Sequence, residues 1–170
     1  MITLEQLLRS RDERAAYQQK MLEEYPDKTL VSFTVQLPGP EKRNQWSAQV
    51  AEAGVDALKE RFGEPSGTRD KDTGFEAYWL VREPALEAKR RCCEIEEKHP
   101  LGRLMDIDVI RKDGPVSRTE AGYEPRQCLL CDRQARFCMR ARTHTNEELL
   151  QKIKEMVESY GIQKVITGRD

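Results

Sequence analysis

The sequence predicts an α+β fold, a single domain in which a mixed β-sheet is flanked by helices. The chain has 170 residues, enough for one domain with a sizeable core. Segments with helical spacing of apolar residues alternate with short strand-like segments, and no internal repeat or low-complexity stretch interrupts them. The expected order, helix-strand-helix-strand-helix-strand-strand-helix-helix, is typical of helices packed on a sheet. We therefore treat residues 1–170 as one domain.

The first half of the chain is expected to hold a helix, a strand, a helix and a loop, at about 3–25, 29–37, 40–62 and 63–74. Leucines at helical spacing mark the first helix, which should end before Pro26. Val31, Phe33 and Val35 alternate with polar residues, which indicates a half-buried strand. The fourth segment carries three glycines and no periodicity, so it predicts a loop.

The second half is expected to hold a strand, a helix, a strand, a hairpin and a helix, at about 75–81, 83–100, 103–110, 111–118 and 146–160. Pro100 should end the charged helix, and Cys92 and Cys93 should be buried on it. Thr145 and Glu148 form a capping-box pattern ahead of the last helix, which Gly161 should end.

Composition limits the function classes. Lys and Arg number 29 and Asp and Glu 30, for a net charge of -1, so the whole molecule is not steered toward nucleic acid or membrane. No apolar stretch reaches the length of a membrane-spanning helix, and the charged N-terminal segment does not resemble a signal peptide. Five cysteines, an odd number, suggest reduced thiols or metal ligands. We expect a cytoplasmic protein without a nucleic-acid or membrane partner.

Two aspartates interrupt the apolar run "LMDIDVI". Asp106 and Asp108 should share one face of a strand, because side chains alternate between the two faces. Close carboxylates repel unless a divalent metal, a basic phosphate-binding cluster or arginine bridges balance them. A solvated pair on a surface strand is the alternative. Mg²⁺ suits oxygen ligands of this kind. Gly102 permits close backbone approach, and Arg103 is a ready phosphate partner.

A cysteine-rich segment follows, with the spacing C-x₂-C-x₆-C-x₅-H. Its members are Cys128, Cys131, Cys138 and His144. Three thiolates and an imidazole can complete a tetrahedral Zn²⁺ shell, although three reduced cysteines around a helix would also explain the pattern. Five arginines lie in the same stretch, and they indicate either phosphate binding or a solvated helix face. His99, at a helix end, is read as a cap or surface residue, with a catalytic base as the less favoured alternative.

Several ordered segments together resemble one family. The segments "VSFTVQLPGP", "HPLGRLMDIDVI", "PVSR", "RQCLLCDRQARFCMRARTH" and "EELLQKIK" are similar to the apo-citrate lyase phosphoribosyl-dephospho-CoA transferases, the holo-acyl-carrier-protein synthases of citrate lyase. The similarity runs from about residue 29 to about residue 160. It implies transfer of the prosthetic group from triphosphoribosyl-dephospho-CoA to a serine of the apo-acyl carrier (gamma) subunit of citrate lyase, with release of diphosphate. That is chemistry of the nucleotidyltransferase type.

The resemblance also implies roles for residues. Asp106 and Asp108 would hold Mg²⁺, and Arg103, beside the metal, completes the catalytic set. From the chemistry of the residues themselves, we expect the triphosphate to be bound near Gly102 by Arg103 and Arg118 together with members of the basic segment, namely Arg126, Arg136 and Arg140. The same basic segment is the expected docking face for the acidic carrier protein. A third carboxylate is left open among Glu76, Asp113 and Glu120, and the base that deprotonates the serine is unassigned. The alternative function is a zinc-stabilised basic binding module for an acidic partner, without catalysis.

Overall fold

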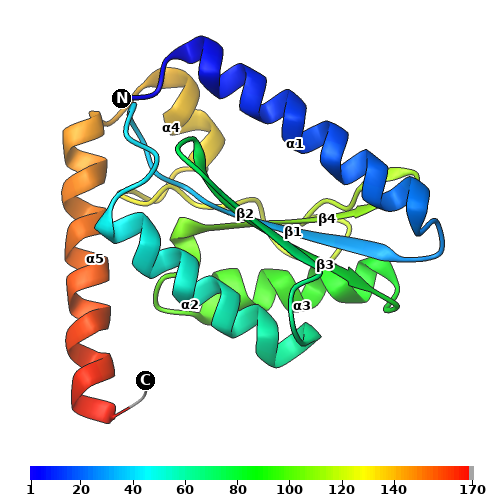
Figure 1. The fold of residues 1–170 in the computed structure, drawn as a ribbon. Helices are drawn as coiled ribbons and strands as arrows, with labels where there is room; N and C mark the ends of the chain where they lie inside the picture. Colours follow the sequence, from blue (N-terminus) through cyan, green and yellow to red (C-terminus); the bar gives the residue numbers. More distant parts are fainter. Residues whose placement is uncertain (169–170) are drawn as a thin grey trace.

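A five-stranded sheet forms the centre of the computed structural model, which describes residues 1–168 (Figure 1). The strand order is β2-β3-β1-β4-β5, and every neighbouring pair is antiparallel. The bounds are β1 Thr29–Val35, β2 Gly67–Lys71, β3 Gly74–Val81, β4 Met105–Arg111 and β5 Gly114–Pro115. The predicted α+β class is confirmed. The sheet is antiparallel throughout rather than mixed, because two hairpins, β2-β3 and β4-β5, flank β1.

The helices cover both faces of this sheet. They are α1 Leu4–Glu24, α2 Gln45–Phe62, α3 Ala85–Lys98, α4 Ala135–Ala141 and α5 Asn146–Thr167, with a 3₁₀ turn at Gly102–Leu104. Figure 1 shows α1 and α4 on one side of the sheet and α2 and α3 on the other, while α5 stands at one end beside α2.

The hydrophobic core lies between the sheet and the α2–α3 layer. Phe33, Trp79 and Ile107, from three adjacent strands, are almost fully buried there. Gly54 of α2 lies directly on Phe33, since a Cβ at this position would be 2.2 Å from the ring atom Cζ. In each of these strands every second residue therefore points into the core, and the residues between them point to the opposite face of the sheet.

The opposite face of the sheet, under α1, is polar. Gln18 of α1 donates a hydrogen bond of 2.9 Å to the hydroxyl of Ser32 on β1. The rings of Tyr17 and Tyr78 are 4.8 Å apart, which joins α1 to β3 as well. Because α1 reaches the sheet largely through polar and aromatic contacts, this face leaves room for charged side chains.

Three element boundaries differ from the prediction. Residues 63–74 do not form a loop, because Gly67–Lys71 pairs with β3 as an edge strand. Helix α2 begins at Gln45, where Asn44 caps it, rather than near residue 40. Helix α5 continues through Gly161 to Thr167, since one interior glycine costs only about 1 kcal/mol. None of the helices between residues 1 and 168 is both long and apolar enough to cross a membrane.

Candidate functional site

The two aspartates of β4 project from the face that α1 covers. Along this strand Met105, Ile107 and Val109 are buried in the core, whereas Asp106 is partly exposed and Asp108 exposed. Asp108 lies opposite Ser32 of β1, the residue that Gln18 of α1 contacts. The strand alternation expected from the sequence is therefore observed, and both carboxylates share one polar face.

Nothing in the described chain balances these two charges directly. Among residues 1–168, neither carboxylate has a side-chain hydrogen bond or an ion pair. The surrounding protein atoms raise the pKa of Asp108 from 3.8 to about 6, and the negative charge of Asp106 is the second cause. The Asp108 side chain nevertheless remains accessible to solvent. Arginine bridges therefore do not balance the pair. A divalent metal, a basic phosphate-binding cluster and a solvated pair remain of the interpretations drawn from the sequence.

A third carboxylate on the same face is already neutralised. Glu76 of β3 is buried, accepts a 2.7 Å hydrogen bond from the Tyr78 hydroxyl, and lies 3.7 Å from Arg69 and 4.0 Å from Arg14. Thr34 of β1 lies between Glu76 and Asp106 in the strand register. Glu76 therefore holds two arginines above the sheet.

The other two candidates for a third carboxylate lie outside this face. Asp113 is exposed in the turn between β4 and β5, and Glu120 accepts a hydrogen bond from the backbone of Ser117 in a later turn.

The sequence reasoning missed the two arginines that pair with Glu76, which are Arg14 and Arg69. The sequence signal for Arg14 is polar residues at helical spacing on α1, and Arg69 lies on β2, a strand that the sequence did not predict.

The outer edge of β4 is closed by side chains of α3. β5 pairs only with the last two residues of β4, so the backbone groups of Ile107 lack a strand partner on that side. Lys89 donates to the Ile107 carbonyl at 3.0 Å, and Glu96 accepts from the Ile107 N–H at 3.1 Å. Burying an unpaired backbone group is costly, so these two buried side chains stabilise the strand that carries the aspartates.

Arg118 and Arg126 belong to this edge. Arg118 contacts Glu96 at 2.7 Å and also pairs with Glu97, and Arg126 lies 3.3 Å from Glu96. Their side chains are only 12% and 16% exposed. Burial raises the pKa of Glu96, against the opposing effect of Arg126. The structure gives both arginines a packing role, and their phosphate-binding role stays a prediction without supporting contacts.

The residues just before β4 form a tight turn. Gly102 is buried against the end of α3, where a Cβ would be 2.3 Å from the Glu96 carbonyl oxygen. The backbone at Gly102 therefore does approach another group closely, as predicted, but that group is the end of α3. Gly102 serves the packing of the turn and is not placed at a phosphate. Arg103 is half-buried near Arg126, and burial lowers its pKa. His99 accepts a 2.9 Å hydrogen bond from the Leu101 N–H, as expected for a capping residue.

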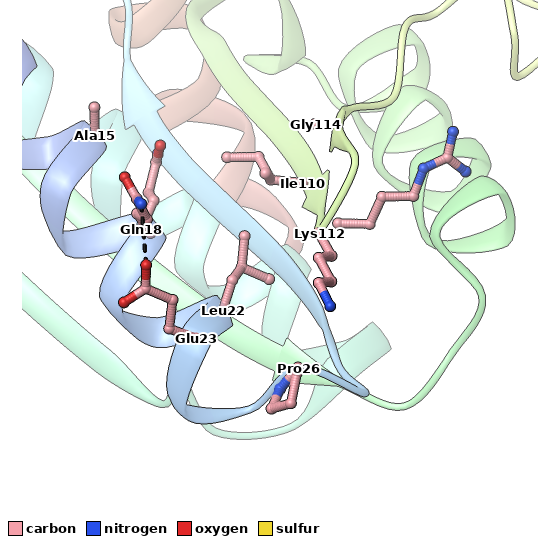
Figure 2. A pocket seen from close by; sticks show the side chains of 10 residues that line it. Ala15, Gln18, Leu22, Glu23, Pro26, Ile110, Lys112 and Gly114 are labelled. Atoms are coloured by element: carbon pink, nitrogen blue, oxygen red, sulfur yellow. Dashed lines mark hydrogen bonds between the residues drawn. The ribbon is translucent and has the colours of Figure 1, made fainter.

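A cleft of about 530 Å³ lies on the same side of the sheet as α1, although neither aspartate lines it (Figure 2). It lies between the second half of α1 and the β4–β5 hairpin, and its apolar wall includes Ala15, Leu22 and Ile110. Ile110 follows Asp108 by two residues and therefore lies on the same face of β4. Lys112 places a cationic group at this cleft. The cleft and the aspartates are therefore on the same face of the sheet.

Arg136 and Arg140 lie on α4 and line a shallow hollow of about 410 Å³. Phe137, between them, is 52% exposed, and Met139 is 78% exposed. Figure 1 shows α4 on the same side of the sheet as α1. The structure thus brings these arginines to the side of the sheet that carries the aspartates, on a surface that is both basic and apolar.

The predicted metal ligands converge. One ligand atom each of Cys128, Cys131, Cys138 and His144 lies within 4.8 Å of the others. Burial raises the pKa of the Cys128 thiol, but hydrogen bonds from the backbone N–H groups of Leu130 and Cys131 and from the Cys131 and Cys138 side chains together lower it to about 7. Outside this group, Cys92 and Cys93 are buried on α3, as predicted. These four residues form a Cys₃His cluster that can hold a metal ion.

Comparison with known proteins supports the resemblance. A family model described as "Apo-citrate lyase phosphoribosyl-dephospho-CoA transferase" matches residues 2–160. A Vibrio cholerae protein named "Probable apo-citrate lyase phosphoribosyl-dephospho-CoA transferase" is 40% identical over 168 residues, covering 94% of this chain and 93% of its own. A Streptococcus pyogenes protein of the same name is 33% identical over 167 residues, covering 94% and 87%. The chain belongs to the apo-citrate lyase phosphoribosyl-dephospho-CoA transferase family.

Proposed function

We propose that this transferase moves the phosphoribosyl-dephospho-CoA group from triphosphoribosyl-dephospho-CoA to a serine of the citrate lyase acyl carrier subunit, and that it does so at Asp106 and Asp108. Family membership supports the transferase class and citrate lyase as the acceptor system. The observation that carries the site is the carboxylate pair without an ion-pair partner on the sheet face under α1, the face on which the cleft also lies. By contrast, Glu76 on the same sheet face and Glu96 at the β4 edge each pair with two arginines.

The donor set of the pair suits a hard divalent cation. Asp106 and Asp108 offer oxygen ligands on one face, and Ser32 and Thr34 add neutral oxygens in the adjacent register positions. Mg²⁺ prefers oxygen ligands and is usually held by one or two carboxylates together with substrate phosphates. When bound, Mg²⁺ supplies positive charge that neutralises the phosphates and stabilises the leaving diphosphate.

Two arginines are placed to bind the triphosphate. Arg14 and Arg69 lie on the aspartate face, and Glu76 orients both of them. Their side chains are 32% and 25% exposed, so they retain access to solvent and to a ligand. In the proposed reaction the serine oxygen bonds to the innermost phosphorus, the bond to the diphosphate oxygen breaks, and the serine proton passes to water. Positioning and charge neutralisation supply most of the acceleration in such transfers.

The cleft and α4 have separate roles in this proposal. The apolar wall at Leu22 and Ile110 accommodates part of the dephospho-CoA moiety, which extends away from the triphosphate. The acidic surface of an acyl carrier protein matches the basic surface of α4, where Arg136 and Arg140 flank Phe137. The carrier serine then approaches the aspartates from the α4 side of the sheet.

Mass spectrometry of the acyl carrier subunit tests the proposal. The subunit is incubated with the triphosphate donor, Mg²⁺ and the enzyme, and the expected result is a mass increase equal to phosphoribosyl-dephospho-CoA. Asp106→Asn and Asp108→Asn should each reduce the rate by about 10³-fold, since such sites stabilise the transition state by several kcal/mol. Asp113→Asn, in the exposed turn after the same strand, is the matched control and should retain the rate.

Full transfer by either aspartate variant would overturn the assigned site. Absence of any mass increase with the wild-type protein and Mg²⁺ would instead favour the alternative of a non-catalytic basic binding module. The Asp113→Asn control separates a specific effect from a general loss of acidic charge near β4.

A further inference from the structure

We infer that Cys128, Cys131, Cys138 and His144 bind one structural zinc ion, and that this ion fixes the turn that leads into the aspartate strand. The zinc site itself does not depend on the proposed function. Its effect on the aspartates rests on the proposed site at Asp106 and Asp108.

The distances within the cluster fit a four-coordinate zinc ion. Tetrahedral ligands at about 2.3 Å for sulfur and about 2.0 Å for nitrogen lie roughly 3.5 to 3.8 Å from one another. The four ligand atoms here are all within 4.8 Å, and the Cys131 and Cys138 sulfurs are 3.5 Å apart. That separation is far longer than a disulfide bond of about 2.05 Å. Small side-chain adjustments therefore suffice to close a metal shell.

The polar groups of the cluster are arranged to bind a common ligand. The His144 Nε2 atom is buried and has no hydrogen-bond partner among the described residues. Such an orphaned buried atom is rare and costly unless something binds it. The Leu130 N–H approaches the Cys128 sulfur at 3.5 Å, a contact that favours a thiolate. A metal ion between the sulfurs and this nitrogen satisfies all four groups at once.

The donor set selects zinc and a structural role. Three soft thiolates and one imidazole favour zinc over the hard cations proposed for the carboxylates. Four protein ligands fill a tetrahedral shell and leave no open position for substrate, which is characteristic of structural sites. The two metals of this protein are therefore of different chemical classes and are bound at different places.

The surrounding segment needs such a cross-link. α4 has seven residues, too few to be stable alone, and Phe137 and Met139 on it are exposed. A narrow hairpin precedes it, in which the Cys128 N–H donates to the Arg133 carbonyl at 2.7 Å. His144 comes just before Thr145, the N-cap of α5. Zinc therefore ties the hairpin, α4 and the start of α5 together, where little hydrophobic burial does so.

Arg126 connects the Cys₃His cluster to the strand that carries the aspartates. It lies two residues before Cys128, and its guanidinium donates to the carbonyl oxygens of Gly102, Arg103 and Met105 at 3.2, 2.9 and 2.8 Å. These three carbonyls belong to the turn and to the first residue of β4, immediately before Asp106. Holding Cys128 in place therefore also holds Arg126 in place. Arg126 in turn holds the backbone at the start of β4, which positions Asp106.

Elemental analysis of the untagged wild-type protein tests the metal site. We expect one zinc per chain, and X-ray absorption of that protein should show three sulfur ligands and one nitrogen ligand. Cys131→Ser and His144→Ala should each lose the zinc. Cys93→Ala, a buried cysteine outside the cluster, is the matched control and should retain it. Wild-type protein that neither contains zinc nor binds added zinc would overturn the inference, as would zinc retained in a Cys131→Ser/His144→Ala double variant.

Hydrogen exchange tests the link to β4. Removal of zinc from the wild-type protein with a chelator should increase amide exchange at residues 102–106 at least tenfold, while exchange in the core strand β1 is unchanged. Unchanged exchange at residues 102–106 after complete zinc removal would overturn the coupling. Asp106→Asn should lose transfer activity but keep its zinc. The zinc content therefore reports on this inference even if the proposed function fails.

Discussion

Replacing Asp108 by asparagine should make the protein more stable while it removes activity. The pKa of Asp108 is raised from 3.8 to about 6, first by burial and then by the charge of Asp106. The folded protein therefore binds more protons than the unfolded chain between about pH 4 and pH 6. Under proton linkage, its free energy of unfolding falls as the pH rises through that window. An asparagine side chain at this position carries no charge and escapes this cost.

The magnitude follows from the same shift. A difference between 3.8 and about 6 corresponds to roughly 3 kcal/mol at about 1.36 kcal/mol per pKa unit. Because solvent reaches the Asp108 side chain, screening reduces this figure, and we expect a gain of about 1 kcal/mol at pH 7.5. For a chain of this size, about 1 kcal/mol raises the melting temperature by about 2–4 °C.

Differential scanning calorimetry without divalent metal checks this prediction. Asp108→Asn should melt about 2–4 °C above the wild type at pH 7.5, with the difference vanishing near pH 4. Added Mg²⁺ should stabilise the wild type and leave the variant unchanged. Asp113→Asn, in the exposed turn, should change the melting temperature by less than about 1 °C. Equal melting temperatures of wild type and Asp108→Asn at both pH values would refute the reasoning that these carboxylates lack a partner.

Three further predictions concern the edge, the core and the docking surface. Glu96→Gln should lower the free energy of unfolding by about 3–5 kcal/mol in urea denaturation, because it removes the buried carboxylate that Arg118 and Arg126 share and leaves Arg126 without an ion pair. A loss below about 1 kcal/mol would contradict the edge role. Gly54→Ala should cost about 1–3 kcal/mol in the same assay, since its Cβ meets the ring of Phe33, and an unchanged midpoint would show that α2 is less closely packed. In steady-state kinetics, Arg136→Glu/Arg140→Glu should raise the KM for the carrier protein by about tenfold or more and leave the KM for the triphosphate donor unchanged. A raised KM for the donor with an unchanged KM for the carrier protein would instead assign these arginines to phosphate binding.

Much of the fold could be predicted because its elements have strong local periodicity. The helix on residues 4–24 and the three central strands β1, β3 and β4 follow from apolar spacing and from Pro26. β2 could not be predicted, since "GTRDK" has no apolar pattern and becomes a strand only by pairing with β3. Strand direction depends on which strands become neighbours, and this antiparallel order is a tertiary property. For that reason the predicted mixed sheet was wrong in detail.

The candidate site divides in the same way. Asp106 and Asp108 lie two residues apart, and the cysteine–histidine cluster falls within one short segment, so local spacing revealed both groups. Arg14 and Arg69 come from α1 and β2 and meet only in the folded chain. For Arg118 and Arg126, by contrast, the sequence shows the residues but not their partner. Counting charges along the sequence indicates phosphate binding, but it cannot reveal that Glu96, on helix α3, already pairs with both.

The central claim is that the carboxylates of β4 together bind a divalent cation, and Mn²⁺ titration followed by electron paramagnetic resonance tests it most directly. At pH 7.5, zinc-loaded wild-type protein should bind one Mn²⁺, which Mg²⁺ displaces, and Asp106→Asn/Asp108→Asn should bind none. The Cys131→Ser variant, folded and lacking zinc, should still bind Mn²⁺ at its carboxylates. Equal Mn²⁺ binding by the wild type and the double aspartate variant would contradict the account.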